Sequence, residues 1–225
     1  DPADRPGVKE GAGWIQDAAA AFAATLFGDL AGKDVIDLCA APGGKTAQLI
    51  AGGAQVTAVG SSAKRLKTLR GNLSRLGMKA QCVTADGRSF DPGRKVDAVL
   101  IDAPCSATGT LRRRPDSLRG RKQEDIKVMA QLQHALVRQA AGWLKPNGCL
   151  IYATCSLQFE EGEHIADAIA ADSGAGLVPD PVSADEAGDF AAAITAAGTV
   201  RLRPDLFTGI GGVDGFFVAR FRAPG

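Results

Sequence analysis

The sequence lacks any apolar run that approaches the roughly 18 residues of a membrane-spanning helix, and its first residues lack the basic-then-apolar pattern of a secretory signal. Aromatic residues make up only 5% of the chain, whereas hydrophobic residues make up 45%. This balance is ordinary for a soluble globular domain, and 225 residues are enough to bury one substantial core. We therefore expect a single domain with additions and no association with a membrane.

Cysteine and histidine are scarce and scattered. The chain has five cysteines, an odd number, and two histidines, and nothing groups them at the spacings of a disulfide framework or a zinc site. We therefore expect reduced thiols, no bound metal and a cytoplasmic location. Free cysteine is among the most buried residue types, so Cys39, Cys82 and Cys149 are expected to be small core residues.

Two common nucleotide-binding fingerprints are missing from the glycine loop that follows a short predicted strand at residues 34–38. The loop, residues 39–46, reads Cys-Ala-Ala-Pro-Gly-Gly-Lys-Thr. A Walker loop needs glycine five positions before Gly44, where this chain has Cys39, and the dinucleotide pattern Gly-x-Gly-x-x-Gly is also absent. A bent loop that lets the backbone approach a ligand, without a cradle for phosphate, suits S-adenosylmethionine, which carries no phosphate.

Positive charge is concentrated in one segment and absent from another, although the net charge is only +1. No Lys or Arg occurs in residues 146–200, where acids recur. Between residues 112 and 122, one acid stands among six basic residues, which are Arg112, Arg113, Arg114, Arg119, Arg121 and Lys122. A charge run is often only a solvated face. This basic run, however, closely follows Cys105, a candidate active-site residue, and that proximity favours a polyanionic substrate.

Strand and helix patterns alternate along most of the chain. The predicted strands are residues 34–38, 55–59, 81–84, 96–101 and 149–153, with a last strand after a turn at 213–215, and the predicted helices are residues 15–27, 46–51, 63–76 and 123–143. Residues 174–198 are typical of an irregular insertion with one helix at most. The alternation predicts an α/β fold in which a mostly parallel sheet has helices on both faces and binds ligands at the strand carboxyl ends.

Two cysteine motifs fall at such strand ends. Residues 102–106 read Asp-Ala-Pro-Cys-Ser, and residues 153–157 read Ala-Thr-Cys-Ser-Leu. A single cysteine at a strand end is more often structural than reactive. Two in matching contexts, downstream of a cofactor-type loop, instead favour covalent chemistry by Cys105 and Cys155.

The glycine loop and the two cysteine motifs together resemble the Sun-type family of RNA cytosine C5 methyltransferases. The resemblance covers nearly the whole chain and includes residues 11–17, 37–46, 102–109, 113–116, 153–156 and 214–217. It implies a Rossmann-like class I methyltransferase fold with a seven-stranded sheet, in which residues 1–30 lead into a catalytic domain at residues 31–225. Family members commonly carry an additional N-terminal RNA-binding domain, and because this sequence begins with Asp1 we expect one to precede it.

The chemistry of the family explains why two thiols are needed. C5 of cytosine is a poor nucleophile, so a thiolate adds to C6, C5 attacks the sulfonium methyl group, the C5 proton leaves and the thiol is eliminated. The resemblance implies that Cys155 is the nucleophile, with a lowered pKa, and that Cys105 helps to resolve the adduct. It implies that Asp102 meets the cytosine edge or the cofactor, and that the base leaves its stack to react.

The resemblance also assigns cofactor-binding residues. They are Cys39, Ala40, Ala41, Pro42, Gly43, Gly44 and Lys45 in the loop, with Asp86 and Asp102 after later strands. Position 60 departs from the family, which has an acid there to accept bonds from the ribose hydroxyls, whereas this chain has Gly60. Loss of that contact is expected to weaken cofactor binding by about 1.5 to 3 kcal/mol unless Ser61, Ser62 or water replaces it.

The first expectation is therefore methylation of cytosine C5 in RNA, with ribosomal RNA as the leading substrate and tRNA the next. Arg112, Arg113 and Arg114 are expected to bind the RNA, and a monomer is the default state. One alternative, based on Gly60, is an RNA-binding ribosome-assembly factor with a degraded cofactor site. Another is a methyltransferase that acts on a different atom or substrate. A DNA cytosine methyltransferase fits less well, since that class has its nucleophile in the Pro-Cys motif.

Overall fold

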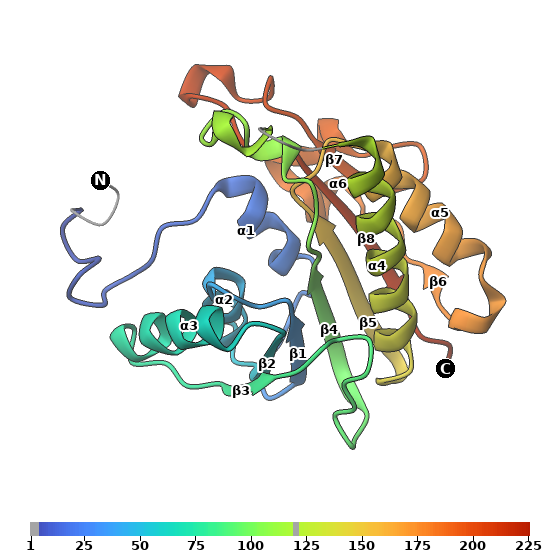
Figure 1. Ribbon diagram of the computed structural model, residues 1–225, viewed down its shortest axis with the longest axis horizontal. Coiled ribbons are helices and arrows are strands. Elements are labelled where there is room, and N and C mark those ends of the chain that lie inside the picture. The colour runs from blue at the N-terminus through green and yellow to red at the C-terminus, as the bar shows by residue number, and fades with distance from the viewer. Residues whose placement is uncertain (1–4, 119–121) are drawn as a thin grey trace.

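An eight-stranded sheet runs through the centre of the protein, shown in Figure 1 as a computed structural model that describes residues 5–118 and 122–225. Its order is β3-β2-β1-β4-β5-β8-β6, and β7 pairs with β8. The strands are β1 (Asp34–Leu38), β2 (Gln55–Gly60), β3 (Gln81–Thr84), β4 (Val96–Asp102), β5 (Leu144–Thr154), β6 (Val178–Pro179), β7 (Val200–Leu202) and β8 (Phe216–Arg222). Strands β1 to β5 pair in parallel, and β8 is antiparallel to its three neighbours.

Helices cover both faces of this sheet (Figure 1). One face carries α1 (Ala18–Thr25), α2 (Gly44–Ala51) and α3 (Ala63–Arg75), together with the short α6 (Ala184–Ala187). The other face carries α4 (Gln123–Ala141) and α5 (Glu163–Ala171). No helix in the described ranges is long and apolar enough to cross a bilayer.

The strands are apolar on both sides because both sides are covered. In β4, Ala98 and Leu100 belong to the core cluster under α1 and α2, while Val99 and Ile101 belong to the cluster under α4 and α5. Successive residues of a strand point to opposite faces, so one apolar run fills two cores. The α/β class and the mostly parallel sheet expected from the sequence are confirmed.

The strand count and several boundaries differ from expectation. The sheet has eight strands rather than seven, because residues 178–179 and 200–202 form β6 and β7 against β8. The first helix is shorter than the predicted 15–27 and begins after Asp17, whose carboxylate caps it by accepting from the backbone N–H of Ala19. Strand β5 begins at Leu144 rather than Cys149. The residues between them are accommodated by a register shift of β5 against β4, between Val96 and Ala98.

The strand order places a ligand-binding crevice at one point. Strand β1 lies between β2 and β4, so the direction of chain progression reverses between β1 and β4. In open sheets of this type, ligands bind outside the carboxyl ends of the strands at such a reversal. The glycine loop follows β1, and the first cysteine motif follows β4.

Candidate active site

The glycine loop after β1 is bent, and residues of α3 pack against it and bind its backbone. Cys39 has a φ of 65° and Gly43 a φ of 108°, both in the left-handed region. A Cβ on Gly43 would come within 2.9 Å of the Leu69 side chain, so only glycine fits this close approach. The Arg65 guanidinium donates to the carbonyl of Ala41 over 2.5 Å. The loop is thus a supported turn that opens the end of β1 to a ligand.

Beneath this loop lies the buried carboxylate of Asp37, for which the sequence predicted no role. The Thr46 hydroxyl donates to Oδ2 of Asp37 over 2.5 Å, and Oδ1 has no hydrogen-bond partner among the described residues. Burial raises the pKa of Asp37 to about 7, opposed by the Thr46 hydrogen bond. Asp37 therefore holds a proton at pH values where an exposed aspartate is ionised.

This carboxyl predicts an unusual pH dependence of stability. The folded state keeps the Asp37 proton up to about pH 7, whereas the unfolded chain loses it near 3.8. The folded state thus binds more protons between these values, so the free energy of unfolding falls as pH rises from 5 to 7, by at most about 1.4 kcal/mol per unit. Urea unfolding at pH 5, 6 and 7 measures the slope. Asp37→Asn is expected to remove it, and an equal slope in that variant would refute the assignment.

Lys45 links the loop to the end of β4. Its Nζ lies 2.9 Å from Oδ2 of Asp102 and 4.9 Å from the ring centre of Phe216. The Lys45 side chain is only 8% exposed, whereas that of Asp102 is 34% exposed. The lysine end of this ion pair is therefore shielded from solvent, and the aspartate end faces the cavity. Asp102 is thereby fixed at the carboxyl end of β4, where the sequence predicts it to act.

The two motif cysteines meet directly. Strands β4 and β5 are neighbours, with Asp102 opposite Ala153, so both motifs leave the sheet at the same edge. The Sγ atoms of Cys105 and Cys155 lie 3.4 Å apart. This contact joins the reactive atoms of the two motifs, so the ionisation of one thiol affects that of the other.

The expected low pKa of Cys155 is not found in this arrangement. The hydrogen bond to Cys105 raises the pKa of the Cys155 thiol well above its ordinary value, and burial raises it further. The same hydrogen bond, now donated by Cys155, lowers the pKa of Cys105. Once one of two thiols in contact has ionised, the two sulfurs share the remaining proton, so ionisation of the second thiol is suppressed. Of the two thiols, Cys105 is therefore the one that ionises first.

A cavity of about 300 Å³ connects these parts. Its walls include Cys39, Ala41 and Arg65 on the side of the glycine loop, and Asp102, Cys105 and Cys155 on the side of the cysteine motifs. The cavity thus gathers part of the predicted cofactor loop and all three predicted catalytic residues. Met129 of α4 also lines it. Cys39 is half-buried at this wall rather than in the core, Cys82 is half-buried, and Cys149 is buried as expected.

Gly60 and Asp86 lie on the same sheet edge but outside the lining of this cavity. The backbone N–H of Ala85 donates to the carbonyl of Gly60 over 3.1 Å, which joins the ends of β2 and β3. The Asp86 carboxylate is paired with Arg88, whose hydrogen bonds lower the pKa of Asp86 to about 2. Asp86 is therefore an ionised, partly exposed acceptor next to Gly60.

The three arginines expected to bind RNA are not equivalent. Arg112 lies 3.0 Å from an oxygen of Asp17 and 3.4 Å from one of Asp214, and Arg113 is paired with Asp214. Both guanidinium groups thus bind Asp17, which precedes α1, and Asp214, which precedes β8. Arg114 is exposed, and no ion pair of it is found among the described residues. Arg119 and Arg121 lie outside the described residues.

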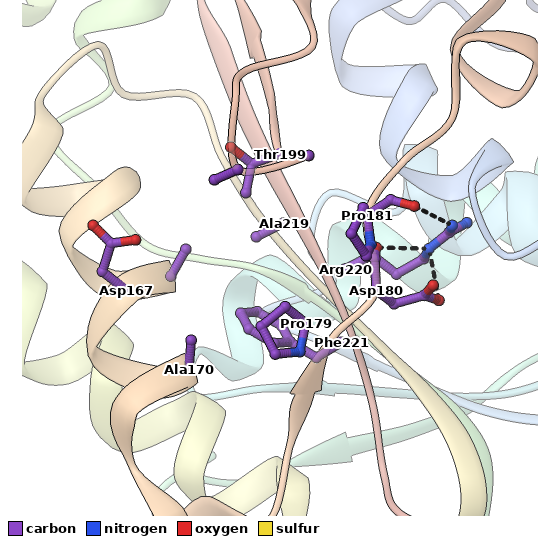
Figure 2. A pocket seen from close by; sticks show the side chains of 12 residues that line it. Asp167, Ala170, Pro179, Asp180, Pro181, Thr199, Ala219, Arg220 and Phe221 are labelled. Carbon is purple, nitrogen blue, oxygen red and sulfur yellow. Dashed lines mark hydrogen bonds and ion pairs between the residues drawn. The ribbon is translucent and has the colours of Figure 1, made fainter.

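A second cavity, of about 120 Å³, lies away from the strand carboxyl ends. It is formed between α5 and the chain around β6 and β8 (Figure 2). Arg220 in its wall is already bound, since its Nε lies 2.9 Å from the carboxylate of Asp180 and its Nη1 lies 2.6 Å from that of Glu186. None of the predicted site residues lines this cavity. In the described ranges, no group of three His, Cys, Asp or Glu side chains could hold a metal ion.

Sequence reasoning missed several residues of the site. Arg65 was placed only in a basic helix, although it supports the glycine loop. Glu161 lies in the segment where acids recur and for which no site was predicted, yet it is completely buried beside both cysteine motifs. No local pattern marks either residue, because their roles depend on segments far apart in the chain.

Comparisons with known proteins agree with this geometry. A family model described as 16S rRNA methyltransferase RsmB/F matches residues 26–222. The ribosomal RNA small subunit methyltransferase B of Shewanella oneidensis is 43% identical over 166 residues, which cover 72% of this chain and 39% of that protein. The protein of the same name from Sodalis glossinidius is 40% identical over 220 residues, which cover 96% of this chain and 47% of that protein.

A solved structure shares the fold. The crystal structure of NSun6 from Pyrococcus horikoshii with SFG has a TM-score of 0.80 and 28% identity, and covers 98% of this chain and 55% of that chain. The chain thus spans about half or less of the length of these relatives. The Rossmann-like methyltransferase fold and the resemblance drawn from the motifs are both confirmed. Because the family model matches most of the sequence, the chain belongs to the RsmB/F family of 16S rRNA methyltransferases.

Proposed function

We propose that this chain carries the catalytic centre of an S-adenosylmethionine-dependent methyltransferase that modifies C5 of cytosine in RNA, with ribosomal RNA as the substrate. The observation that carries the proposal is the contact of the two motif sulfurs, 3.4 Å apart, in a cavity shared with the glycine loop. The names of the curated relatives, which refer to ribosomal RNA, support the substrate class. The test is incubation of the whole protein with ribosomal RNA and cofactor, followed by nucleoside mass spectrometry for 5-methylcytosine.

The residues at the end of β1 fit the proposed cofactor. The bent loop lets the backbone approach a ligand, and the nearby carboxylates of Asp86 and Asp102 suit a ligand with a sulfonium, an ammonium and ribose hydroxyls. A related protein was solved with SFG, an S-adenosylmethionine analogue, which supports the same choice. When bound, the cofactor supplies the methyl group. Residues 39–45, Asp86 and Asp102 would hold it.

The thiol pair is proposed to act in sequence. The Cys105 thiolate takes the proton of Cys155, and the Cys155 sulfur then forms a bond to C6 of the cytosine. Lys45 lies near enough to lower the pKa of Cys155, which favours this transfer. After methylation, the C5 proton is released to water, the carbon–sulfur bond breaks with its electron pair returning to the Cys155 sulfur, and the proton held by Cys105 passes back to Cys155. Asp102, held by Lys45, is placed to hydrogen-bond the base edge.

Arg114 is the arginine of the basic segment that we propose to contact RNA. Arg112 and Arg113 are paired with carboxylates, whereas Arg114 is exposed. Arg114→Ala is expected to weaken RNA binding by about three- to tenfold and to lower the salt slope of log Kd by about one, because one phosphate contact is lost. Fluorescence anisotropy over a salt series measures both. Lys33→Ala, an exposed cation at the opposite end of β1, is the control, and equal effects of the two variants would contradict the assignment.

One observation favours a second candidate, a ribosome-assembly factor that binds RNA without methylating it. Gly60 lacks the carboxylate that the family uses for the ribose hydroxyls. Calorimetric titration with S-adenosylmethionine separates the two functions. Binding at micromolar to submillimolar cofactor supports the methyltransferase, and no binding at millimolar cofactor supports the assembly factor.

A further inference from the structure

Glu161 is a buried carboxylate located between the two cysteine motifs. It ends the short 3-10 turn Phe159–Glu161, its side chain is 0% exposed, and no cation among the described residues forms an ion pair with it. A buried carboxylate without a counterion is costly unless hydrogen bonds replace the lost water. The charge of Glu161 therefore depends on its hydrogen-bond partners.

The partners of Glu161 are the residues that directly follow the two thiols. Oε1 accepts from the backbone N–H of Ser106 over 2.9 Å, and Oε2 accepts from the hydroxyl of the same serine. Oε2 also accepts from the hydroxyl of Ser156 over 2.5 Å. Ser106 follows Cys105 and Ser156 follows Cys155 in the sequence. One carboxylate therefore ties together the two loops whose sulfurs touch.

The surroundings hold Glu161 itself in place. Gln133 on α4 donates to Oε1 over 3.1 Å and to the carbonyl of Pro104 over 2.8 Å. The hydroxyl of Tyr152 donates to the backbone carbonyl of Glu161 over 2.5 Å. The network thus extends from α4 and β5 into both motifs and leaves the carboxylate little freedom to move.

We propose that Glu161 is a positioning residue, which holds the sulfurs of Cys105 and Cys155 in contact and favours the proton on Cys105 when Cys155 attacks. This inference rests on the proposed covalent function. Its geometric basis is the shared pair of oxygens that binds both serines. The hydrogen bond from Cys155 lowers the pKa of Cys105, whereas the negative charge of Glu161 raises it. The charge of Glu161 therefore also favours the proton on Cys105. Cys105 is thereby a better acceptor for the Cys155 proton.

Glu161→Gln tests the role of the charge with little change in shape. Without the charge, the midpoint of Cys105 alkylation by iodoacetamide, followed over pH by peptide mass spectrometry, is expected to move to lower pH. Turnover is expected to fall about 10- to 100-fold with little change in KM for RNA. Glu160→Gln is the matched control, since Glu160 contacts Gln123 rather than either cysteine motif.

Ser106→Ala tests geometry separately, because it removes the hydroxyl that contacts Glu161, Ser156 and Thr108 and leaves the charge of Glu161 in place. We expect it to lower turnover without moving the alkylation midpoint. The proposal is overturned if Glu161→Gln leaves both the midpoint and turnover as Glu160→Gln does, or if it lowers only the melting temperature. If the wild-type protein forms no 5-methylcytosine, the proposed function fails, whereas the alkylation midpoint of the same variants still decides the role of Glu161.

Discussion

Cys155→Ala is expected to abolish RNA methylation, and Cys105→Ala to stop the reaction at a covalent protein–RNA complex. The first change removes the sulfur that bonds to C6, without which C5 cannot attack the methyl group, so activity falls on the order of a thousandfold or more. The second leaves this sulfur in place and removes the hydrogen bond that raises its pKa, so attack continues, but it also removes the thiol at 3.4 Å that returns a proton to Cys155 on release. Denaturing electrophoresis with labelled RNA and cofactor measures the adduct, and nucleoside mass spectrometry measures product.

Cys82→Ala is the control for these variants. Cys82 is a half-buried thiol in β3 with no part in the cavity, and the variant should methylate normally and show no stable adduct. If instead Cys155→Ala accumulates the adduct and Cys105→Ala is inert, the two roles are exchanged. Absence of an adduct with either variant, while the wild type methylates RNA, would refute the covalent mechanism.

Gly60→Asp is expected to tighten S-adenosylmethionine binding by about 10- to 100-fold. The new carboxylate would accept two bonds from the ribose hydroxyls, which corresponds to about 1.5 to 3 kcal/mol. The structure has room for it, because Gly60 has no left-handed φ and a Cβ there meets only the Leu66 side chain, at an ordinary 3.6 Å. Isothermal titration calorimetry measures the change in Kd.

Two further substitutions at this position separate charge from bulk. Gly60→Ala adds only the Cβ and is expected to leave Kd unchanged, and Gly60→Asn adds a neutral side chain of the same shape and is expected to recover a small part of the gain. An unchanged or weaker affinity in Gly60→Asp would mean that Ser61, Ser62 or water already meets the ribose.

The strands that form the site could be predicted because local sequence determines them. Strand β1 was predicted at its observed bounds, since its apolar run is interrupted by the glycine loop. Strands β6 and β7 could not be predicted in the same way. They have two and three residues, lie in or beside an alanine- and glycine-rich segment, and are strands only because β8 pairs with them.

The meeting of the two thiols could be inferred from the sequence, but its electrostatics could not. Parallel neighbouring strands end at the same edge, so two strand-end motifs were bound to lie close together if β4 and β5 paired. The order in which Cys105 and Cys155 ionise depends on a contact of 3.4 Å, which no motif encodes. For the same reason the sequence showed the charge of Arg113 but not its partner, Asp214, which follows 101 positions later.

The most direct test of the account is to locate the bond between protein and RNA. RNA that carries 5-fluorocytidine has no C5 proton to lose, so the wild-type protein should remain attached to it after methyl transfer. We expect peptide mass spectrometry to find the nucleotide on the peptide that contains Cys155, with Cys105 free. A nucleotide on Cys105, or methylation of ordinary RNA with no attachment to the fluorinated RNA, would contradict the account.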